Sequence, residues 1–187
     1  MLTYVYGDLV EAALQGKVDI MVQGCNCFCT MGGGIARDIR EKIPEAYTVD
    51  CTTKKGDRSK LGSQTTVQIE GRNGKTVTII NAYTQYTFWD PNDMFSIDAL
   101  RSCFTTIKNR YGTDDPNFRR IIGIPLIGAG LAQGNWGEIS SVLEEINFAE
   151  RNLYLVVYVK FEKDWKDIVV MNFPSLMRTS IKDLPIL

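Results

Sequence analysis

Three cysteines, an asparagine and three consecutive glycines lie within one short stretch, Cys25–Arg37 (CNCFCTMGGGIAR). Residues of these types can bind a metal ion, carry out thiol redox chemistry or form a loop that holds a ligand. A structural zinc site commonly has four ligands in two CxxC-type pairs, whereas the spacing here is C-x-C-x-C and the chain contains no histidine. The CxxC spacing of disulfide oxidoreductases is absent as well. We therefore expect no metal site and no cofactor.

Cysteine-based phosphatase chemistry is not supported either. Such an enzyme would carry an arginine six positions after its nucleophile. The residues at that distance from the five cysteines are Met31, Gly33, Ile35, Asp57 and Asn109. The lack of histidine also excludes Ser-His-Asp and Cys-His catalysis. We interpret the cysteines as small, partly buried residues that border a loop.

The glycines indicate a ligand-binding loop instead. Residues 19–43 predict a strand, an irregular loop, the triple glycine and then a helix. Glycines before a helix let the backbone approach a ligand, and the helix N-terminus offers free N–H groups and a positive dipole end. Phosphate suits such a site without any basic side chain. The stretch matches neither the P-loop nor the GxGxxG dinucleotide motif.

A second segment, residues 122–139, has the same arrangement of strand, glycine-rich loop and helix. Its loop is Gly128–Gly134 (GAGLAQG). Two such loops predict a pocket at the strand ends of an open α/β sheet, where ligands usually bind. On this argument alone, the alternative that both loops are ordinary tight turns stays open.

The elements that would position these loops follow from hydrophobic periodicity. Glu70–Lys75 predicts an antiparallel hairpin, and a helix is expected over Ile35–Ile43. Further helices start at Asp8, Ser96 and Asn135, the first and last of which resemble capping boxes. The predicted strands are Leu2–Tyr6, Asp19–Gln23, Thr65–Ile69, Thr76–Asn81, Arg120–Leu126 and Leu153–Val159. This pattern predicts an α/β fold: a three-layer α/β/α sandwich with a mixed, mostly parallel central sheet.

Composition bounds the protein class. With 187 residues and 44% hydrophobic composition, we expect a single domain over residues 1–187, with 162–187 a C-terminal extension packed on it. The net charge of −1 makes extended nucleic-acid binding unfavourable, and the basic stretch 52–60 is interpreted as a solvated loop. The N-terminus lacks a signal-peptide pattern, and no apolar run reaches the ~20 residues of a membrane span. We expect a cytoplasmic monomer with reduced cysteines and no membrane partner.

Three ordered motifs resemble the macrodomain family, whose members recognise ADP-ribose. They are Gly7–Leu9 (GDL), Cys25–Ala36 and Ile124–Trp136. The likeness covers roughly residues 2–161. The first loop is most similar to the yeast-type ADP-ribose 1''-phosphate phosphatase branch, and the whole stretch also resembles macrodomain antitoxins that act on ADP-ribosylated DNA.

The resemblance implies roles for individual positions. Asp8 would accept a hydrogen bond from the adenine amino group, with the Leu9 backbone beside it. Asn26 would lie against the distal ribose and, as the one catalytic candidate, position an attacking water. Tyr158 would pack on adenine, although an inward core position is equally compatible with its strand. The implied ribose- and diphosphate-binding residues are Gly32, Gly33, Gly34 and Ile35 from the first loop, and Gly128, Ala129, Gly130, Leu131 and Ala132 from the second.

Several positions depart from related branches. Gln85 stands where the antitoxin and terminal-ADP-ribose glycohydrolase branches have lysine, and Ala132 where the latter has an acidic residue. Ala36 replaces an aspartate of a further hydrolase branch, and Met31 replaces a common histidine. The resemblance therefore implies a partner that is ADP-ribose or ADP-ribose 1''-phosphate, and a phosphatase-like hydrolase. The alternative is a non-catalytic reader or sequesterer; hydrolysis of ADP-ribose from protein or nucleic acid lacks a visible catalytic group.

Aromatic residues follow the strand at Thr76–Asn81. The run consists of Tyr83, Tyr86, Phe88 and Trp89. Near the expected pocket, such side chains can contact a base, act as a lid or belong to the core. We favour the core.

Overall fold

The computed structural model describes residues 2–172, which form one six-stranded sheet. The strand order is β1-β6-β5-β2-β4-β3, and all neighbours are parallel except the antiparallel β3–β4 hairpin. This confirms the predicted mixed, mostly parallel sheet and its hairpin. The strands are β1 (Thr3–Tyr6), β2 (Ile20–Cys25), β3 (Gln64–Glu70), β4 (Thr76–Tyr83), β5 (Arg120–Ile124) and β6 (Leu153–Val159).

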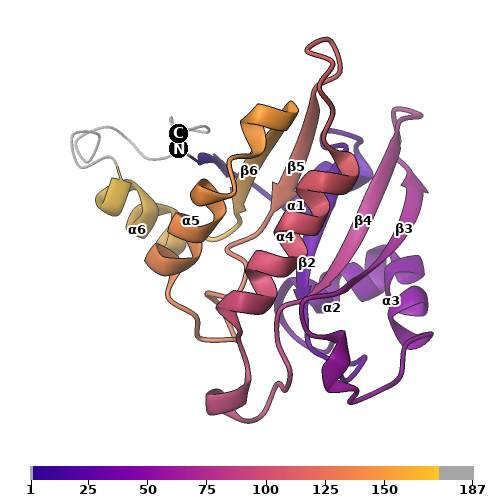
Figure 1. The fold of residues 1–187 in the computed structure, drawn as a ribbon, viewed down its shortest axis with the longest axis vertical. Helices are drawn as coiled ribbons and strands as arrows, with labels where there is room; N and C mark the ends of the chain where they lie inside the picture. The colour runs from indigo at the N-terminus through magenta and orange to yellow at the C-terminus, as the bar shows by residue number, and fades with distance from the viewer. Residues whose placement is uncertain (1, 173–187) are drawn as a thin grey trace.

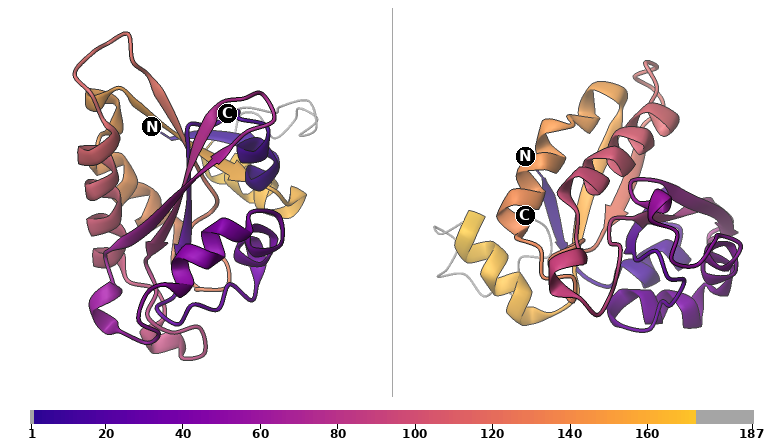
Figure 2. Two further views of the ribbon diagram at one scale, coloured as in Figure 1. Left: turned by 90° about the vertical axis from the view of Figure 1, so that its right-hand side faces the viewer. Right: turned by 60° about the horizontal axis from the view of Figure 1, so that its bottom comes forward.

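Helices cover both faces of this sheet, as Figures 1 and 2 show. Helices α4 and α5 lie on one face, and α1, α2 and α3 lie on the other. The predicted three-layer sandwich is therefore confirmed. The helices are α1 (Leu9–Leu14), α2 (Gly34–Lys42), α3 (Pro44–Cys51), α4 (Ile97–Tyr111), α5 (Trp136–Glu145) and α6 (Glu162–Asn172), with short 3₁₀ turns η1 (Arg58–Lys60), η2 (Pro91–Asp93) and η3 (Phe148–Arg151).

Polar side chains start three of these helices where the sequence predicts them. Asp8, Ser96 and Asn135 each accept backbone N–H groups two or three residues later, at 2.9–3.2 Å. Such caps satisfy N–H groups that have no partner within the helix. The reciprocal half of the first capping box is missing, because Glu11 accepts from Gln15 instead of returning to the Asp8 backbone.

Helix α3 is a feature that the sequence analysis does not predict. Pro44 ends α2 as expected, and it also occupies the first position of α3. Proline is tolerated there because the N–H that it lacks would have no helical partner in any case. In this short helix only Ala46 and Asp50 are buried, so its sequence shows no apolar stripe.

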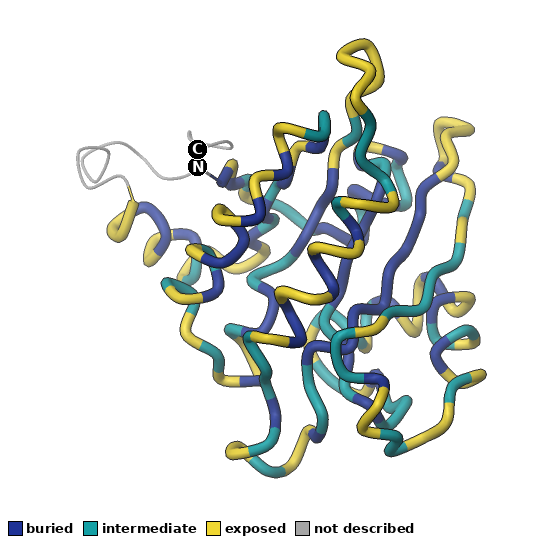
Figure 3. The backbone as a smooth tube through the Cα atoms, viewed as in Figure 1, coloured by how far each residue is buried: buried dark blue, intermediate teal, exposed yellow. Residues whose placement is uncertain are grey.

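The apolar core has a main cluster on each side of the sheet and a smaller third one that includes Cys25, Cys27, Met31 and Tyr83. Figure 3 shows that the sheet strands are largely buried, whereas the exposed residues lie mainly in loops and on the outer sides of the helices. On the α4–α5 side, Leu100, Phe104 and Ile107 of α4 are fully buried, as their helical spacing predicts. On the opposite side, Ile39 of α2 packs with Met21 and other sheet residues. None of the described helices combines the length and apolar character that crossing a bilayer requires.

Helix α6 packs into the same core as α5. Trp165 is completely buried, and Ile168 and Val169 lie beside it in the larger cluster. Residues 162–172 of the predicted C-terminal extension therefore form a helix that is continuous with the core. The predicted packing of residues 173–187 lies outside the described residues.

Substituting Trp165→Ala tests this packing. We expect the free energy of unfolding to fall by roughly 3–5 kcal/mol, because the change removes a large buried side chain and leaves a cavity. Val170→Ala on the exposed side of α6 is the matched control and should stay within about 0.5 kcal/mol of wild type. Urea unfolding measures both. Equal small effects would show that α6 is not part of the cooperative core.

Candidate ligand-binding site

A cleft of about 1040 Å³ lies at the carboxyl ends of the parallel strands, the lower edge of the sheet in Figure 1. It is framed by the loop after β2 and the loop after β5, the two segments with glycine-rich sequences. Ala129 is the one predicted ligand-binding residue that does not line it, because Ala129 packs against the core. The predicted residues that do line it are Asp8, Leu9, Asn26, Gly32, Gly33, Gly34, Ile35, Gly128, Gly130, Leu131, Ala132 and Tyr158.

The first loop is shaped by Asn26. Its side-chain oxygen accepts the Phe28 backbone N–H at 2.8 Å, and its side-chain nitrogen donates to the Thr30 hydroxyl at 2.8 Å. Cys29 and Met31 then adopt left-handed backbone conformations, with φ of +54° and +39°. Conformations of this kind cost about 1–3 kcal/mol each for residues with side chains, and they concentrate at functional sites.

The triple glycine leads directly into α2 and leaves its first N–H groups free. Gly33 is the N-cap, and no side chain caps the helix. The backbone N–H groups of Gly34, Ile35 and Ala36 belong to the first turn and have no helical acceptor. These residues line the cleft, and free N–H groups at a helix start, together with the helix dipole, can bind an anion.

The second loop is closed on itself and presents a further set of N–H groups. The Gly134 N–H donates to the Gly128 carbonyl at 2.8 Å, and Gly128 has φ of +76°. By contrast, the N–H groups of Gly130, Leu131 and Ala132 make no hydrogen bond to any of residues 2–172. A loop of this kind can bind the far side of the same anion.

The two loops meet across the cleft. Leu131 is 73% exposed, and its Cδ1 atom lies 2.9 Å from where a Cβ atom at Gly33 would be. Any side chain at Gly33 would therefore have to displace Leu131. Around Gly32 and Gly130, by contrast, a Cβ atom would meet no neighbour within 4 Å, so these glycines border open space.

At the opposite end from Asn26, the Asp8 carboxylate is held by charges and N–H groups. One oxygen caps α1, and the other pairs with the Lys160 ammonium at 2.9 Å. Lys160 also contacts Asp38 at 2.8 Å and so connects three elements. Burial acts to raise the pKa of Asp8, but Lys160 and the capping N–H groups outweigh it, so this pKa is lowered. Its two carboxylate neighbours raise the pKa of Lys160.

Tyr158 is both a core residue and a residue of the cleft, the two alternatives that its strand position left open. Its ring packs against the core cluster that includes Leu9 and also lines the cleft. The ring lies 3.4 Å from a Cβ position at Gly123, and the absence of a side chain there makes room for Leu9, whose Cδ1 atom would be 2.6 Å from that position. Burial raises the pKa of the Tyr158 phenol above its ordinary value.

The cysteines of the first loop make separate hydrogen bonds and do not converge. Cys27 donates to the Gln85 carbonyl at 3.4 Å, whereas Cys29 contacts the Asp50 carbonyl at 3.3 Å. Burial raises the pKa of Cys27 to about 11 and that of Cys25 well above its ordinary value. These two thiols stay protonated and are poor nucleophiles. Across residues 2–172, no three potential metal-ligating side chains gather at one point.

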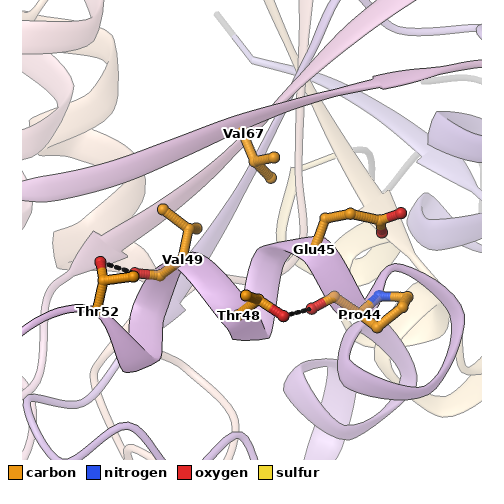
Figure 4. A pocket seen from close by; sticks show the side chains of 6 residues that line it. All are labelled: Pro44, Glu45, Thr48, Val49, Thr52 and Val67. Carbon is orange, nitrogen blue, oxygen red and sulfur yellow. Dashed lines mark hydrogen bonds between the residues drawn. The ribbon is translucent and has the colours of Figure 1, made fainter.

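A second depression lies between α3 and β3 and has a volume of about 450 Å³ (Figure 4). The hydroxyl groups of Thr48 and Thr52 donate to carbonyl groups of their own helix, as Figure 4 shows. Glu45 is the one charged residue that lines it, and besides these two threonines the other lining residues are apolar. Since no set of polar groups converges here, the cleft at the strand ends is the stronger candidate.

Known proteins share this architecture. A family model described as "Macro domain" matches residues 22–143, which is more than half of the chain. The chain belongs to the macrodomain family. This confirms the family to which the three sequence motifs point.

Two curated relatives of this macrodomain cover most of its length. An uncharacterized 17.5 kDa protein in the tk-vs intergenic region of Enterobacteria phage T4 is 34% identical over 145 residues, 77% of this chain and 88% of that protein. An ADP-ribose 1''-phosphate phosphatase of Debaryomyces hansenii is 27% identical over 181 residues, 83% of this chain and 99% of that protein. Among solved structures, Thermosipho africanus DarTG in complex with ADP-ribose has a TM-score of 0.68 at 16% identity, covering 90% of this chain and 44% of that chain.

The aromatic run after β4 of this macrodomain is only partly core, contrary to our preference. Tyr83 is buried, but Phe88 and Trp89 are 49% and 56% exposed. Phe88 also lines the cleft, and its ring contacts Trp89 with centroids 4.8 Å apart. The prediction fails for Phe88 and Trp89 because β4 ends at Tyr83, so both residues lie outside the sheet.

The sequence analysis misses five charged residues that line the cleft: Arg37, Asp38, Asp50, Lys160 and Asp164. Lys160 lines the Asp8 end, and Asp50 of α3 lines the cleft while its side chain is only 1% exposed. Lys160 lies two residues after Tyr158, and its closeness in sequence to a predicted site residue is a signal that could have found it. Asp50 has no comparable signal, because its burial depends on a helix without an apolar stripe.

Substituting Lys160→Met tests the electrostatics of the Asp8 end. We expect the pKa of the Asp8 carboxyl to rise toward its ordinary value, because burial is then opposed by the capping N–H groups alone. The stability that ionised Asp8 contributes, which wild type loses as pH falls through its lowered pKa, is then lost at a higher pH. An NMR titration of the side-chain carboxyl measures the change, with Lys166→Met as control. An unchanged Asp8 pKa would show that Lys160 does not hold this carboxylate.

Proposed function

We propose that the cleft binds ADP-ribose, with the diphosphate between the two glycine loops. Two sets of free backbone N–H groups carry this proposal: those of residues 34–36 and those of residues 130–132. They lie on loops that approach each other at Leu131 and Gly33. Oriented N–H groups can neutralise a diphosphate without a basic side chain. The Thermosipho africanus structure, which contains ADP-ribose, supports the choice of ligand.

The two ends of the cleft suit the adenosine end and the distal ribose of such a ligand. Asp8 offers a carboxylate acceptor to an adenine amino group, and Tyr158 offers an aromatic face beside it. Asn26 lies at the other end, beside the first loop, where a distal ribose would bind. The cleft volume of about 1040 Å³ is at the upper limit of typical small-molecule sites and accommodates a dinucleotide-sized ligand.

The proposed reaction is hydrolysis of ADP-ribose 1''-phosphate to ADP-ribose and inorganic phosphate. Asn26 would position the attacking water, and the loop N–H groups would stabilise negative charge as it develops on the phosphoryl oxygens. The Debaryomyces hansenii relative, which is named for this activity, supports the choice of substrate. Phosphoryl transfer depends mainly on positioning and charge stabilisation, so a site made of backbone N–H groups suffices in principle.

A non-catalytic reader of ADP-ribose is the second candidate. It is favoured by one observation: both polar atoms of the Asn26 side chain already have partners inside the loop. An asparagine used in this way contributes to loop shape, and it contributes to chemistry only if a bound substrate replaces one of these contacts. Turnover therefore decides between the two functions.

Phosphate release from ADP-ribose 1''-phosphate is the deciding assay. We expect turnover by wild type and a loss of at least tenfold in kcat for Asn26→Ala, because the water would no longer be positioned. Asn109→Ala, an exposed position on α4, is the matched control. Equal, uncatalysed rates for wild type and Asn26→Ala would remove the phosphatase function.

Calorimetry with ADP-ribose separates the remaining cases. Binding without turnover of ADP-ribose 1''-phosphate supports the reader. Absence of binding to ADP-ribose, AMP and ADP at millimolar concentration would contradict both candidates. Asn26→Asp keeps the acceptor for the Phe28 N–H and so separates the loop shape from the loss of the amide donor.

A further inference from the structure

Asp50 is a buried carboxylate that lines the cleft and has no role in the function proposed so far. It belongs to the last turn of α3, and its side chain is 1% exposed. The Tyr83 hydroxyl donates a hydrogen bond to its Oδ1 atom at 2.7 Å. The Lys60 ammonium, itself buried, lies 4.0 Å from the same oxygen.

This cluster is connected to the loop that carries Asn26. Lys60 donates to the Cys27 carbonyl at 3.1 Å and contacts the Cys29 sulfur at 3.4 Å. The Cys29 thiol in turn contacts the Asp50 carbonyl at 3.3 Å. Asp50 therefore lies next to the first loop, at the Asn26 end of the cleft.

A buried ion pair at this position needs a reason. Removing two charges from water costs several kcal/mol each, and a well-packed apolar pair of similar volume is often at least as stable. Lys60 alone has enough acceptors to fix the loop, since it already contacts the loop backbone. A buried charge that borders a cleft is a candidate for function.

Among the described residues, the other ionisable groups of the cleft are unsuited to act as a base near Asn26. Asp8 and Asp38 are engaged by Lys160 at the far end, and Asp164 lies on α6. Burial keeps the Cys25 thiol protonated, and Arg37 is a cation. The remaining ionisable groups that line the cleft are Tyr158 and Lys160, which belong to the Asp8 end.

We propose that Asp50 is the general base of the cleft, held in place by Tyr83 and Lys60 as positioning residues. This rests on the proposed hydrolysis of ADP-ribose 1''-phosphate. The water oxygen forms a bond to phosphorus, and the bond from phosphorus to the 1'' oxygen breaks with its electron pair remaining on that oxygen. The Asp50 carboxylate takes the proton from water and returns it to the departing 1'' oxygen. The products are ADP-ribose and inorganic phosphate.

Asp50→Asn is the direct test, because it keeps an oxygen that can accept from Tyr83 but removes the base. We expect kcat for phosphate release to fall by about 100-fold or more, within the range that general bases contribute. The Kd for ADP-ribose, measured by calorimetry, should stay within about threefold of wild type. Asp98→Asn, an exposed position in the first turn of α4, is the matched control and should change neither value.

A second variant covers the case in which Asp50→Asn fails to fold because Lys60 is left buried and unpaired. Asp50→Asn together with Lys60→Met removes both charges, and we expect this protein to fold, to bind ADP-ribose and to show the same loss of kcat. Unchanged kcat in a folded variant overturns the proposal. A parallel loss of ADP-ribose binding and turnover also overturns it, since Asp50 would then act only through the shape of the loop.

Assays of wild type beside Asp50→Asn distinguish failure of the base assignment from failure of the phosphatase function. If wild type releases phosphate and Asp50→Asn does so equally well, the base assignment fails while the phosphatase function holds. If wild type binds ADP-ribose but releases no phosphate, the phosphatase function fails and the base assignment fails with it.

Discussion

The parallel pairing of β2 with β5 is the constraint on which the cleft depends. Ile20 lies opposite Ile122 and Met21 opposite Gly123, so both strands end at the same edge of the sheet. Two loops that are about 100 residues apart in sequence are thereby brought face to face. The contact between Leu131 and the Gly33 position is a direct consequence, because neither loop reaches the other without this register.

Two lysines in or beside the cleft are paired with acidic groups of the protein itself. Lys160 is held by two carboxylates, and Lys60 is held by Asp50 and the Cys27 carbonyl. Backbone N–H groups at the start of α2 and in the second loop can supply positive potential to a diphosphate, and the exposed cation Arg37 also lines the cleft. A protein of net charge −1 can thus offer an anion site.

The sequence predicts the six strands, three of the helix caps and both loops, because each depends on local periodicity, on glycine or on a polar cap. It does not predict α3, whose buried residues include Asp50 and form no apolar stripe. The ion pairs of Lys160 join segments far apart in the chain, and the pair of Lys60 depends on the unpredicted helix α3, so no local pattern reports them. The exposure of Phe88 and Trp89 depends on where the chain leaves the sheet, which hydrophobicity alone does not indicate.

A titration of ¹⁵N-labelled protein with ADP-ribose tests the central claim that one ligand lies between the two loops. The account predicts that the backbone amide signals of Gly34 and Ile35 shift together with those of Gly130 and Leu131, along one binding curve, because their N–H groups contact the same diphosphate. AMP, which lacks the second phosphate and the distal ribose, should shift them less. Shifts confined to the depression between α3 and β3, or no shifts at millimolar ADP-ribose, would contradict it.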